Sequence, residues 1–307
     1  MDQLQSKRFQ AMLDVEAPGS GIGARLNRWW LKRAAQRHAS TFAPLLAAAQ
    51  TTAMGQTVDD RPETLSFLRA PYLCAGWSVG ERLTRLTAHV SALAAHPPLD
   101  FRVAHSIELM PLPEIGDAIH VIIDKPMWFH REGTLAINLF DGNTRLFTLV
   151  FAFEPTANGL RALIGGIQGR NFDDALDRYR DLTKAAHGVR PRDLVIELFR
   201  LVCARIGVVE IFAIADKGRQ NRHPYFGKDV MRALPLNYDA IWQDRGGTPV
   251  DEWFYSLPLR GERRADADIA PKKRSMYRQR YAMLDAIEGR MDEAWKGMMP
   301  VTRPDAL

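Results

Sequence analysis

Five strand-like segments follow one another in the middle of the chain, and this run constrains the fold more than any other feature. The segments are FRVAHSIEL, AIHVIIDKP, GTLAINLFDG, RLFTLVFAFE and LRALIGGIQG. The turn sequences DGN at 141–143 and ANG at 157–159 separate the last three of them. Because such short loops join antiparallel neighbours, the run predicts an antiparallel sheet. The alternation of Leu135, Ile137 and Leu139 indicates that one face of this sheet is buried.

Helical patterns lie on both sides of the run. Residues 24–50 and 78–95 are predicted helices before it, and the second opens with a capping box. After it come helices in FDDALDRYRDLTKAAHG and PRDLVIELFRLVCARIG, a buried strand in VVEIFAIAD, and a last helix from about 271 to 296. This order predicts an α+β fold, with helices packed on a mainly antiparallel central sheet. We expect a basic, Trp-containing helical extension at 1–60, the α+β domain at 61–296 and a tail at 297–307.

Basic residues are concentrated at 25–37 and at 260–280, and the formal net charge is +5. A solvated helix face is the simplest interpretation of each cluster, but a basic surface also favours anionic partners. Nucleic acid is not an expected partner, because no zinc finger or RNA-binding aromatic motif accompanies the charge. Trp29 and Trp30 lie within the first cluster, and we expect them to be buried against the rest of the protein. The alternative is that this helix lies on an anionic membrane surface.

The sequence lacks the usual signs of a membrane-spanning or secreted chain. No stretch approaches the roughly 18 uninterrupted apolar residues that a membrane helix needs, and the N-terminus has no continuous apolar core. We therefore expect a cytoplasmic protein without an integral membrane segment, and its basic surface leaves peripheral contact with the inner membrane open. Cys74 and Cys203 are far apart in apolar surroundings, so we expect two buried, reduced thiols.

Several separated blocks of the chain resemble, in the right order, the VirK/YbjX family of bacterial proteins. The blocks are REGTLAINLFDGNTRLFTLVFAFE, LIGGIQG, LTKAAHGVRPRDLV, FAIAD, LNYDAIWQDRGG and KKRSMYRQRYAMLD. The resemblance runs from about Pro62 to Ala294 and leaves residues 1–60 outside. It implies a domain of unknown function associated with virulence, resistance to antimicrobial peptides, envelope remodelling and microcin maturation. The chain departs from the His-Val-Tyr of many relatives at 221–225, where it reads Asn-Arg-His-Pro-Tyr.

The segment KAAHGVRPRDLV, at 184–195, is the first candidate site. His187 lies at a predicted helix end and would transfer a proton, while Lys184 and Arg190 would bind an anionic substrate. The alternative is structural: Gly188 and Pro191 form the turn between two helices, and the charges cap the helix ends.

The segment LIGGIQGRN is the second candidate site. The residues concerned are Gly165, Gly166, Gln168, Gly169 and Arg170, whose backbone amides would hold the anionic part of a cofactor. The segment loosely resembles the pyrophosphate loop of GCN5-related acyltransferases, although its glutamine follows the glycine pair. That resemblance implies coenzyme A or an acyl thioester as the cofactor. The alternative is a glycine turn that allows close backbone packing.

A third set of polar residues is scattered near predicted strand ends. It comprises His130, Arg131, Glu132, Asp216, Arg222 and His223. Two histidines and a carboxylate would suit non-haem iron, but the usual His-x-Asp/Glu spacing with a distant histidine is missing, so no metal ligands are assigned. The chain has no Gly-x-Ser-x-Gly elbow and no Walker motif, which argues against an α/β-hydrolase and against nucleotide hydrolysis.

These observations lead to an acyltransferase-type enzyme that modifies an envelope component or a peptide. In this hypothesis His187, His223 and Asp216 are catalytic, and Arg131 and Arg222 join the substrate-binding residues. Two alternatives remain. One is a non-catalytic envelope-stress or virulence protein that binds an anionic small molecule, a lipid head group or a peptide. The other is a metal-dependent, peptide-modifying oxygenase. The sequence does not indicate an oligomeric state.

Overall fold

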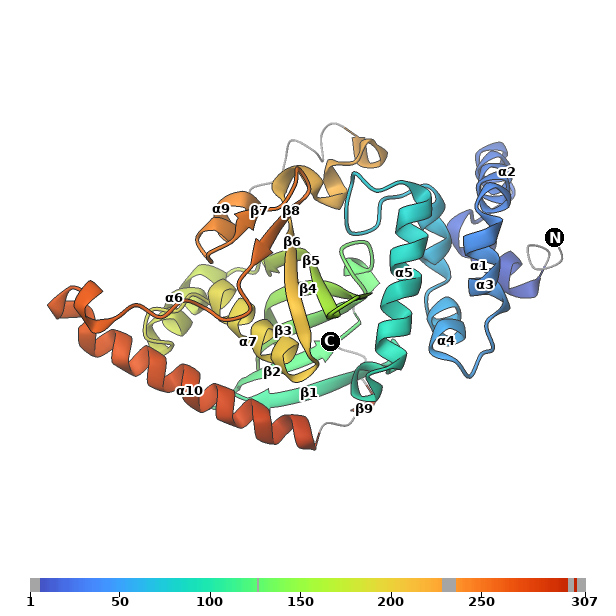
Figure 1. The fold of residues 1–307 in the computed structure, drawn as a ribbon. Coiled ribbons are helices and arrows are strands. Elements are labelled where there is room, and N and C mark those ends of the chain that lie inside the picture. The colour runs from blue at the N-terminus through green and yellow to red at the C-terminus, as the bar shows by residue number, and fades with distance from the viewer. Residues whose placement is uncertain (1–5, 126, 228–235, 298–300, 303–307) are drawn as a thin grey trace.

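The computed structural model describes residues 6–125, 127–227, 236–297 and 301–302 (Figure 1). Within these residues one sheet has nine strands in the order β7-β8-β6-β5-β4-β3-β2-β1-β9. The strands are β1 His105–Pro111, β2 Ile119–Asp124, β3 Leu135–Asp141, β4 Thr144–Thr156, β5 Gly159–Gly169, β6 Val208–Ile214, β7 Thr248–Pro249, β8 Phe254–Leu257 and β9 Val301–Thr302. All neighbours are antiparallel except β5 and β6, which are parallel. The predicted antiparallel run from β1 to β5 is thus confirmed.

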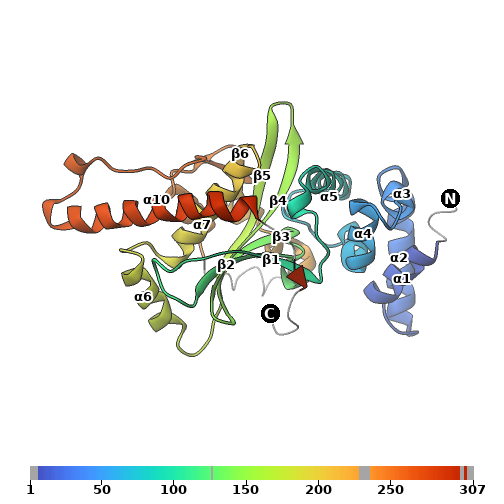
Figure 2. The same cartoon turned by 90° about the horizontal axis from the view of Figure 1, so that it is seen from below.

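Helices cover both faces of this sheet. They are α1 Lys7–Glu16, α2 Ile22–Arg37, α3 Ala39–Ala47, α4 Ala53–Asp60, α5 Val79–Ala94, α6 Ala175–Ala185, α7 Pro191–Arg205, α9 Tyr238–Gln243 and α10 Arg274–Lys296. Figure 2 shows α5 and the N-terminal helices on one side of the sheet, with α6, α7 and α10 on the other. The expected α+β class is therefore confirmed, and the parallel pair β5 and β6 is joined through α6 and α7 on one face.

Two apolar clusters hold these layers together. The main one lies between the sheet and the helices α5, α7 and α10, and it contains both cysteines as buried free thiols, as predicted. The second cluster joins the N-terminal helices to Leu65, Leu68 and Leu83. It therefore crosses the expected boundary at residue 60 and attaches the N-terminal helices to α5.

The expectation for the Trp pair of α2 is wrong. Trp29 and Trp30 are exposed on the outer side of α2, while Leu31, Ala34 and Ala35 face the second cluster. The small side chains of Ala34 and Ala35 allow α2 to pack close to its neighbours. Because consecutive residues are 100° apart around a helix, Trp29 and Trp30 cannot face inward together with Leu31. The helix expected at 24–50 is also divided, because α2 ends at Arg37 and α3 begins at Ala39.

Within the described residues, no helix combines the length and the apolar composition needed to cross a bilayer.

Candidate functional site

The parallel strands β5 and β6 separate at their carboxyl ends. They pair from Leu160 and Val208 as far as Ile164 and Ala213, after which β5 continues to Gly169 without β6 and is paired with β4. At the same level the register between β4 and β5 shifts, so Gly165 is an extra residue without an opposite partner. Bulges of this kind bend a strand and re-aim its neighbours. The carboxyl ends of parallel strands are also where sites form in mixed sheets.

The glycine pair of β5 allows the loop before β3 to lie directly on the strand. A Cβ atom added to Gly165 would come 1.8 Å from the carbonyl oxygen of Glu132, and one added to Gly166 would come 2.0 Å from its Oε2. Only glycine permits such contacts. The structure thus supports the alternative that this glycine pair allows close backbone packing. It also brings the second candidate segment, at 165–170, into contact with Glu132 of the third candidate set.

Glu132 has an unusual carboxyl group. Its Oε2 is buried and has no hydrogen-bond partner among the described residues. Burial raises the pKa of Glu132 from its ordinary value of 4.5 to about 7, although Arg219 and a hydrogen bond from Gln220 oppose the rise. A carboxyl group with this pKa is present in both protonation states near neutral pH. It can therefore both donate and accept a proton there.

Tyr238, the first residue of α9, covers the edge of β5 that β6 leaves unpaired. Its hydroxyl accepts a hydrogen bond from the amide of Ile167 at 2.9 Å and donates one to the carbonyl of Ile167 at 3.0 Å. The guanidinium of Arg219 lies 4.0 Å from the centre of the Tyr238 ring. Burial, followed by the charge of Glu132, raises the pKa of Tyr238 well above its ordinary value. Tyr238 therefore remains a neutral hydroxyl.

Backbone strain occurs beside Glu132. Leu73 is buried and has φ +55°, a left-handed conformation that costs energy for a residue with a branched side chain. The amide of Leu73 donates a hydrogen bond of 2.7 Å to the carbonyl of Arg131. Its Cγ would lie 3.0 Å from a Cβ added to Gly165. Strain of this kind persists where the surroundings enforce it, often at functional sites.

A hollow of about 570 Å³ opens after the end of β6. Its lining comprises Ala75, Asp216, Lys217, Arg222, His223, Pro224, Asp239 and Trp253. The structure thus brings together three residues that the sequence selected, namely Asp216, Arg222 and His223. Gln220 and Arg219, on the same loop as Arg222, connect the hollow to Glu132.

Asp216 is an ion-pair partner within this hollow. It pairs with Arg219 at 3.3 Å and also with Arg222. Burial by itself would raise the pKa of Asp216, but hydrogen bonds from Arg222 and Arg219 bring it below its ordinary value. Asp216 is therefore ionised at neutral pH and orients two arginines. This arrangement does not support the proton-transfer role that the sequence suggested for it.

His223 meets N–H donors at both of its ring nitrogens. Its Nδ1 accepts a hydrogen bond from the amide of Tyr225 at 3.1 Å, and its Nε2 lies 3.2 Å from Nη2 of Arg82. Burial and then the charge of Arg82 lower the pKa of His223, which favours the neutral ring. A neutral ring that accepts at Nδ1 carries its proton on Nε2. Arg82 can only donate, so Nε2 accepts from it only in the other tautomer, and a neutral ring accepts one of these two hydrogen bonds at a time.

Arg82, which the sequence analysis missed, is a buried cation at the base of this region. It is 4% exposed, forms no ion pair among the described residues, and leaves its Nε without a partner there. Its Nη1 donates to the carbonyl of Ala70 at 3.0 Å. The sequence pattern could have revealed Arg82, because this arginine lies on the apolar side of the helix at 78–95, three residues after Val79 and four before Leu86.

The first candidate segment lies elsewhere. His187 occupies the turn between α6 and α7, and its carbonyl accepts two hydrogen bonds from Arg280 of α10, at 3.1 and 3.0 Å. Lys184 pairs with Asp181 on the exposed face of α6, and exposed Arg190 is the residue before α7. The lining of the hollow includes none of them. The positions of His187, Lys184 and Arg190 match the alternative in which this segment is a turn between two helices. Their proposed roles in proton transfer and substrate binding stay predictions.

The remaining residues of the second candidate segment lie on β5 or directly after it. Gln168 and Gly169 are still part of β5, opposite Thr148 and Phe147 of β4. The amide of Arg170 donates to the carbonyl of Leu146 at 2.9 Å, and the amide of Ile167 is bonded to Tyr238. The amides of Ile167 and Arg170 are therefore already used, and the cofactor-binding role of the segment stays a prediction.

Arg131 stacks near two aromatic rings beside the site. Its guanidinium lies 5.8 Å from the ring centre of Tyr225 and 5.9 Å from that of Phe226. Its Nε is buried and has no hydrogen-bond partner among the described residues. Arg131 is thus next to Glu132 in sequence and packed against aromatic rings, and its substrate-binding role stays a prediction.

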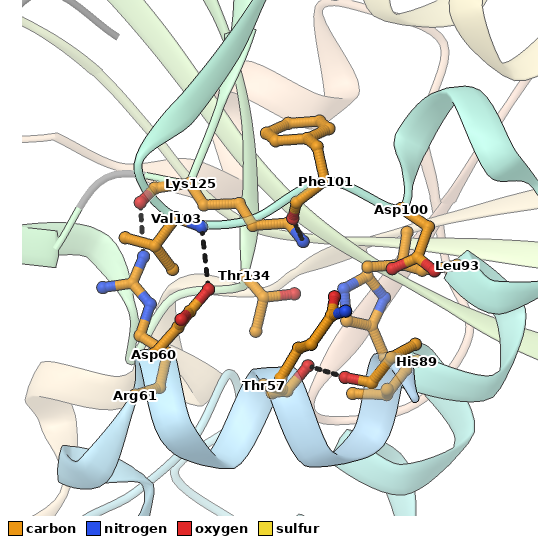
Figure 3. Close-up of a pocket in the computed structure, with 13 residues that line it drawn as sticks. Thr57, Asp60, Arg61, His89, Leu93, Asp100, Phe101, Val103, Lys125 and Thr134 are labelled. Atoms are coloured by element: carbon orange, nitrogen blue, oxygen red, sulfur yellow. Dashed lines mark hydrogen bonds between the residues drawn. The ribbon is translucent and has the colours of Figure 1, made fainter. Parts of the chain in front are cut away.

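A second, smaller polar cavity lies between α4, α5 and the loop that follows β2 (Figure 3). It is lined by Thr57, Asp60, His89, Lys125 and Thr134, among others. Burial lowers the pKa of Lys125 to about 8, and that of His89 to about 3. The volume of about 20 Å³ has room for roughly one water molecule, so this cavity is not a substrate site.

The described part of the chain contains no recognisable metal-binding site. There, no group of three or more His, Cys, Asp or Glu side chains is placed so that it could hold a metal ion. The oxygenase alternative therefore has no ligand set among these residues.

Fold and site together define a mixed α+β protein with a polar centre at the carboxyl ends of its two parallel strands. Residues 23–293 match the family described as "Protein of unknown function (DUF535)", and the chain belongs to that family. The match begins within α2, so the family includes helices that the sequence resemblance had left outside. No solved structure matches the chain, and the likeness to GCN5-related acyltransferases stays a prediction.

Curated relatives confirm the resemblance to the VirK/YbjX family. The uncharacterised protein YbjX of Escherichia coli K12 is 36% identical over 134 residues, which are 44% of this chain and 40% of YbjX. An uncharacterised protein of Haemophilus influenzae Rd is 31% identical over 182 residues, 59% of this chain and 58% of that protein. Membrane protein LapB of Mannheimia haemolytica is 27% identical over 150 residues, 48% of this chain and 63% of that protein. The chain thus spans about half the length of the curated relatives it matches.

Proposed function

We propose that the protein is an enzyme of the acyltransferase type that modifies an envelope component or a peptide, with Glu132 as its acid–base group. The proposal rests on the Glu132 carboxyl group. It lies where β5 and β6 separate, and its pKa is raised to about 7. Perturbed carboxyl groups of this kind are concentrated at catalytic sites. In the proposed reaction an amine or hydroxyl attacks the carbonyl of an acyl thioester and forms the new acyl bond. Glu132 takes the proton of the attacking group and returns it to the thiolate as the C–S bond breaks.

The hollow after β6 suits an anionic ligand. Nη2 of Arg82 lies 3.2 Å from Nε2 of His223, and a negatively charged group beside them would accept hydrogen bonds from this guanidinium. Lys217 and Arg222 line the same hollow. We assign substrate binding to His223, Arg222 and Arg131, and positioning to Asp216, which orients Arg219 and Arg222.

Acyl transfer is favoured by the strand arrangement, which is an argument from analogy. The antiparallel strands β3, β4 and β5, then helices, and then the parallel strand β6 follow in the order that the acyltransferase resemblance implies. Because Ile167 and Arg170 already have partners for their amides, no step is assigned to coenzyme A at Gly165–Arg170. The relative named Membrane protein LapB supports a substrate at the cell envelope.

The test compares cells that contain the wild-type protein, Glu132→Gln or Glu108→Gln. Glu108 is an exposed carboxyl on β1 and serves as the matched control. Lipid and peptide extracts are analysed by mass spectrometry for products heavier by an acyl group. We expect such products with the wild type and with the control, and a loss of at least about 100-fold with Glu132→Gln, as for removal of a general base. Equal products from Glu132→Gln, or no acylated product in any strain, would reject the proposal.

A further inference from the structure

The outer face of α2 has the composition that is normally found inside a protein. Ile22 is 78% exposed, Leu26 is 63%, Trp29 is 60% and Trp30 is 40%. At 100° per residue these four side chains fall on one side of the helix, opposite Leu31. Most of the large apolar residues of α2 thus face outward, while Leu31, Ala34 and Ala35 contact the protein core.

This stripe is unlike the scattered apolar residues of an ordinary surface. Its members are adjacent along three helical turns, and large contiguous apolar patches normally mark an interaction site. Tryptophan, with an apolar ring and a polar N–H, prefers the boundary between a bilayer and water. Val15 of the neighbouring helix α1 is 53% exposed as well. The surface therefore combines aliphatic residues with the aromatic side chain most typical of membrane interfaces.

Cations lie along one side of the stripe and at its C-terminal end, and α2 contains no acidic residue. Arg25, Lys32, Arg33 and Arg37 are exposed, and the guanidinium of Arg33 lies 5.7 Å from the ring centre of Trp29. Arg28 is used internally, since it pairs with Asp14 at 3.1 Å. An apolar stripe bordered by Arg and Lys is the pattern of helices that lie in the plane of an anionic bilayer. A protein partner would need a matching acidic groove, whereas anionic lipid supplies both the apolar and the charged components.

The position of α2 leaves this face accessible. Both views show α2 at the end of the molecule that is remote from α10, outside the sheet and its covering helices (Figures 1 and 2). The inner side of α2 is held by the second apolar cluster through Leu31, Ala34 and Ala35. Contact with a flat surface therefore requires no unfolding of the N-terminal helices.

We propose that α2 docks the protein on the surface of an anionic phospholipid bilayer, with its axis parallel to the membrane. Ile22, Leu26, Trp29 and Trp30 enter the interface, and the flanking cations contact lipid phosphates. This inference is independent of the proposed catalytic role of Glu132. It concerns attachment of α2 to a bilayer surface and requires no helix that crosses the bilayer.

The test is co-sedimentation of the purified full chain with vesicles of equal parts phosphatidylglycerol and phosphatidylcholine, and with vesicles of phosphatidylcholine alone. We expect binding to the anionic vesicles, weakened as sodium chloride is raised because salt screens the cations. The double variant Trp29→Ser/Trp30→Ser should lose about tenfold or more of this affinity. Leu176→Ser/Leu259→Ser removes exposed apolar residues elsewhere and should bind like the wild type.

A second variant tests the contribution of the cations to vesicle binding separately from that of the apolar side chains. Arg33→Glu/Arg37→Glu should also abolish binding to anionic vesicles, while thermal unfolding shows that the fold of each variant is intact. Failure of the wild type to sediment with anionic vesicles overturns the proposal, as does undiminished binding of the Trp29→Ser/Trp30→Ser variant. If sedimentation velocity instead shows a dimer that this variant abolishes, without vesicle binding, the face belongs to a second copy and the proposal fails.

Discussion

The Oε2 atom of Glu132 lies directly over Gly166, so closely that a Cβ on that glycine would be 2.0 Å from it. This contact joins the loop before β3 to the bulged strand β5, at the level where β6 departs. Arg219 connects this carboxyl group, whose pKa is near 7, to the hollow that contains Asp216, Arg222 and His223. The predictions below begin from this contact.

Gly166→Ala should destabilise the protein by about 1–3 kcal/mol, because the added methyl group forces Glu132 away from β5. The free energy of unfolding in urea measures this change. Gly80→Ala is the matched control: it lies in α5 with open space around it, and alanine there should be neutral or stabilise by up to about 1 kcal/mol. Equal effects at both positions would contradict the close contact with Glu132.

Glu132 should make the protein less stable as the pH rises from about 4.5 through 7. Its native pKa is raised from 4.5 to about 7, so the native state holds a proton that the unfolded state releases. The stabilisation is complete below the unfolded pKa and disappears as the pH passes the folded pKa. Urea unfolding of the wild type and Glu132→Gln at pH 5 and pH 8 tests this. The difference in stability between them should change with pH, and a constant difference would refute the raised pKa.

Lys125 should make the protein more stable as the pH rises in the alkaline range. Burial lowers its native pKa from 10.5 to about 8, so between these values the unfolded state binds more protons than the native state. Stability contributed by this group should therefore increase from pH 8 to pH 10. Thermal unfolding at these two pH values, compared between the wild type and Lys125→Met, isolates the contribution. A variant with the same pH dependence as the wild type would show that Lys125 is not the group responsible.

His187→Gly should raise the free energy of unfolding by about 1 kcal/mol, because His187 has φ +49° and glycine adopts this conformation without strain. Chemical denaturation measures the change, with His96→Gly as a control at a residue of negative φ. Activity of the His187→Gly variant, followed in the extract assay, should be unchanged if the turn is purely structural. A stable but inactive variant would restore the acid–base role suggested by the sequence.

Much of the fold follows from local patterns. Alternation at Leu135, Ile137 and Leu139, together with DGN and ANG turns, predicts β3, β4 and β5, because strand period and turn chemistry are properties of neighbouring residues. The capping box at Ser78 and Glu81 similarly marks the start of α5, and the structure contains it. Apolar surroundings were sufficient to predict two buried thiols.

The candidate site was only partly predictable. Sequence reasoning selected Asp216, Arg222 and His223 from their position after a buried strand, and the structure brings them together. It gave Glu132 no individual role and missed Arg82 and Tyr238, because their significance depends on burial and on unpaired atoms. His187 attracted attention through neighbouring charges, which a helix turn equally explains.

By itself, then, the sequence determined the antiparallel run, the helices and the positions of its polar residues, since these depend on period, caps and turns. Only the tertiary structure decided that Glu132 lies over Gly166 and that Trp29 and Trp30 face outward. The physical reason is that pKa values and exposure are set by which distant segments exclude water from a group. That exclusion arises only when β5, β6 and the loop before β3 have packed together.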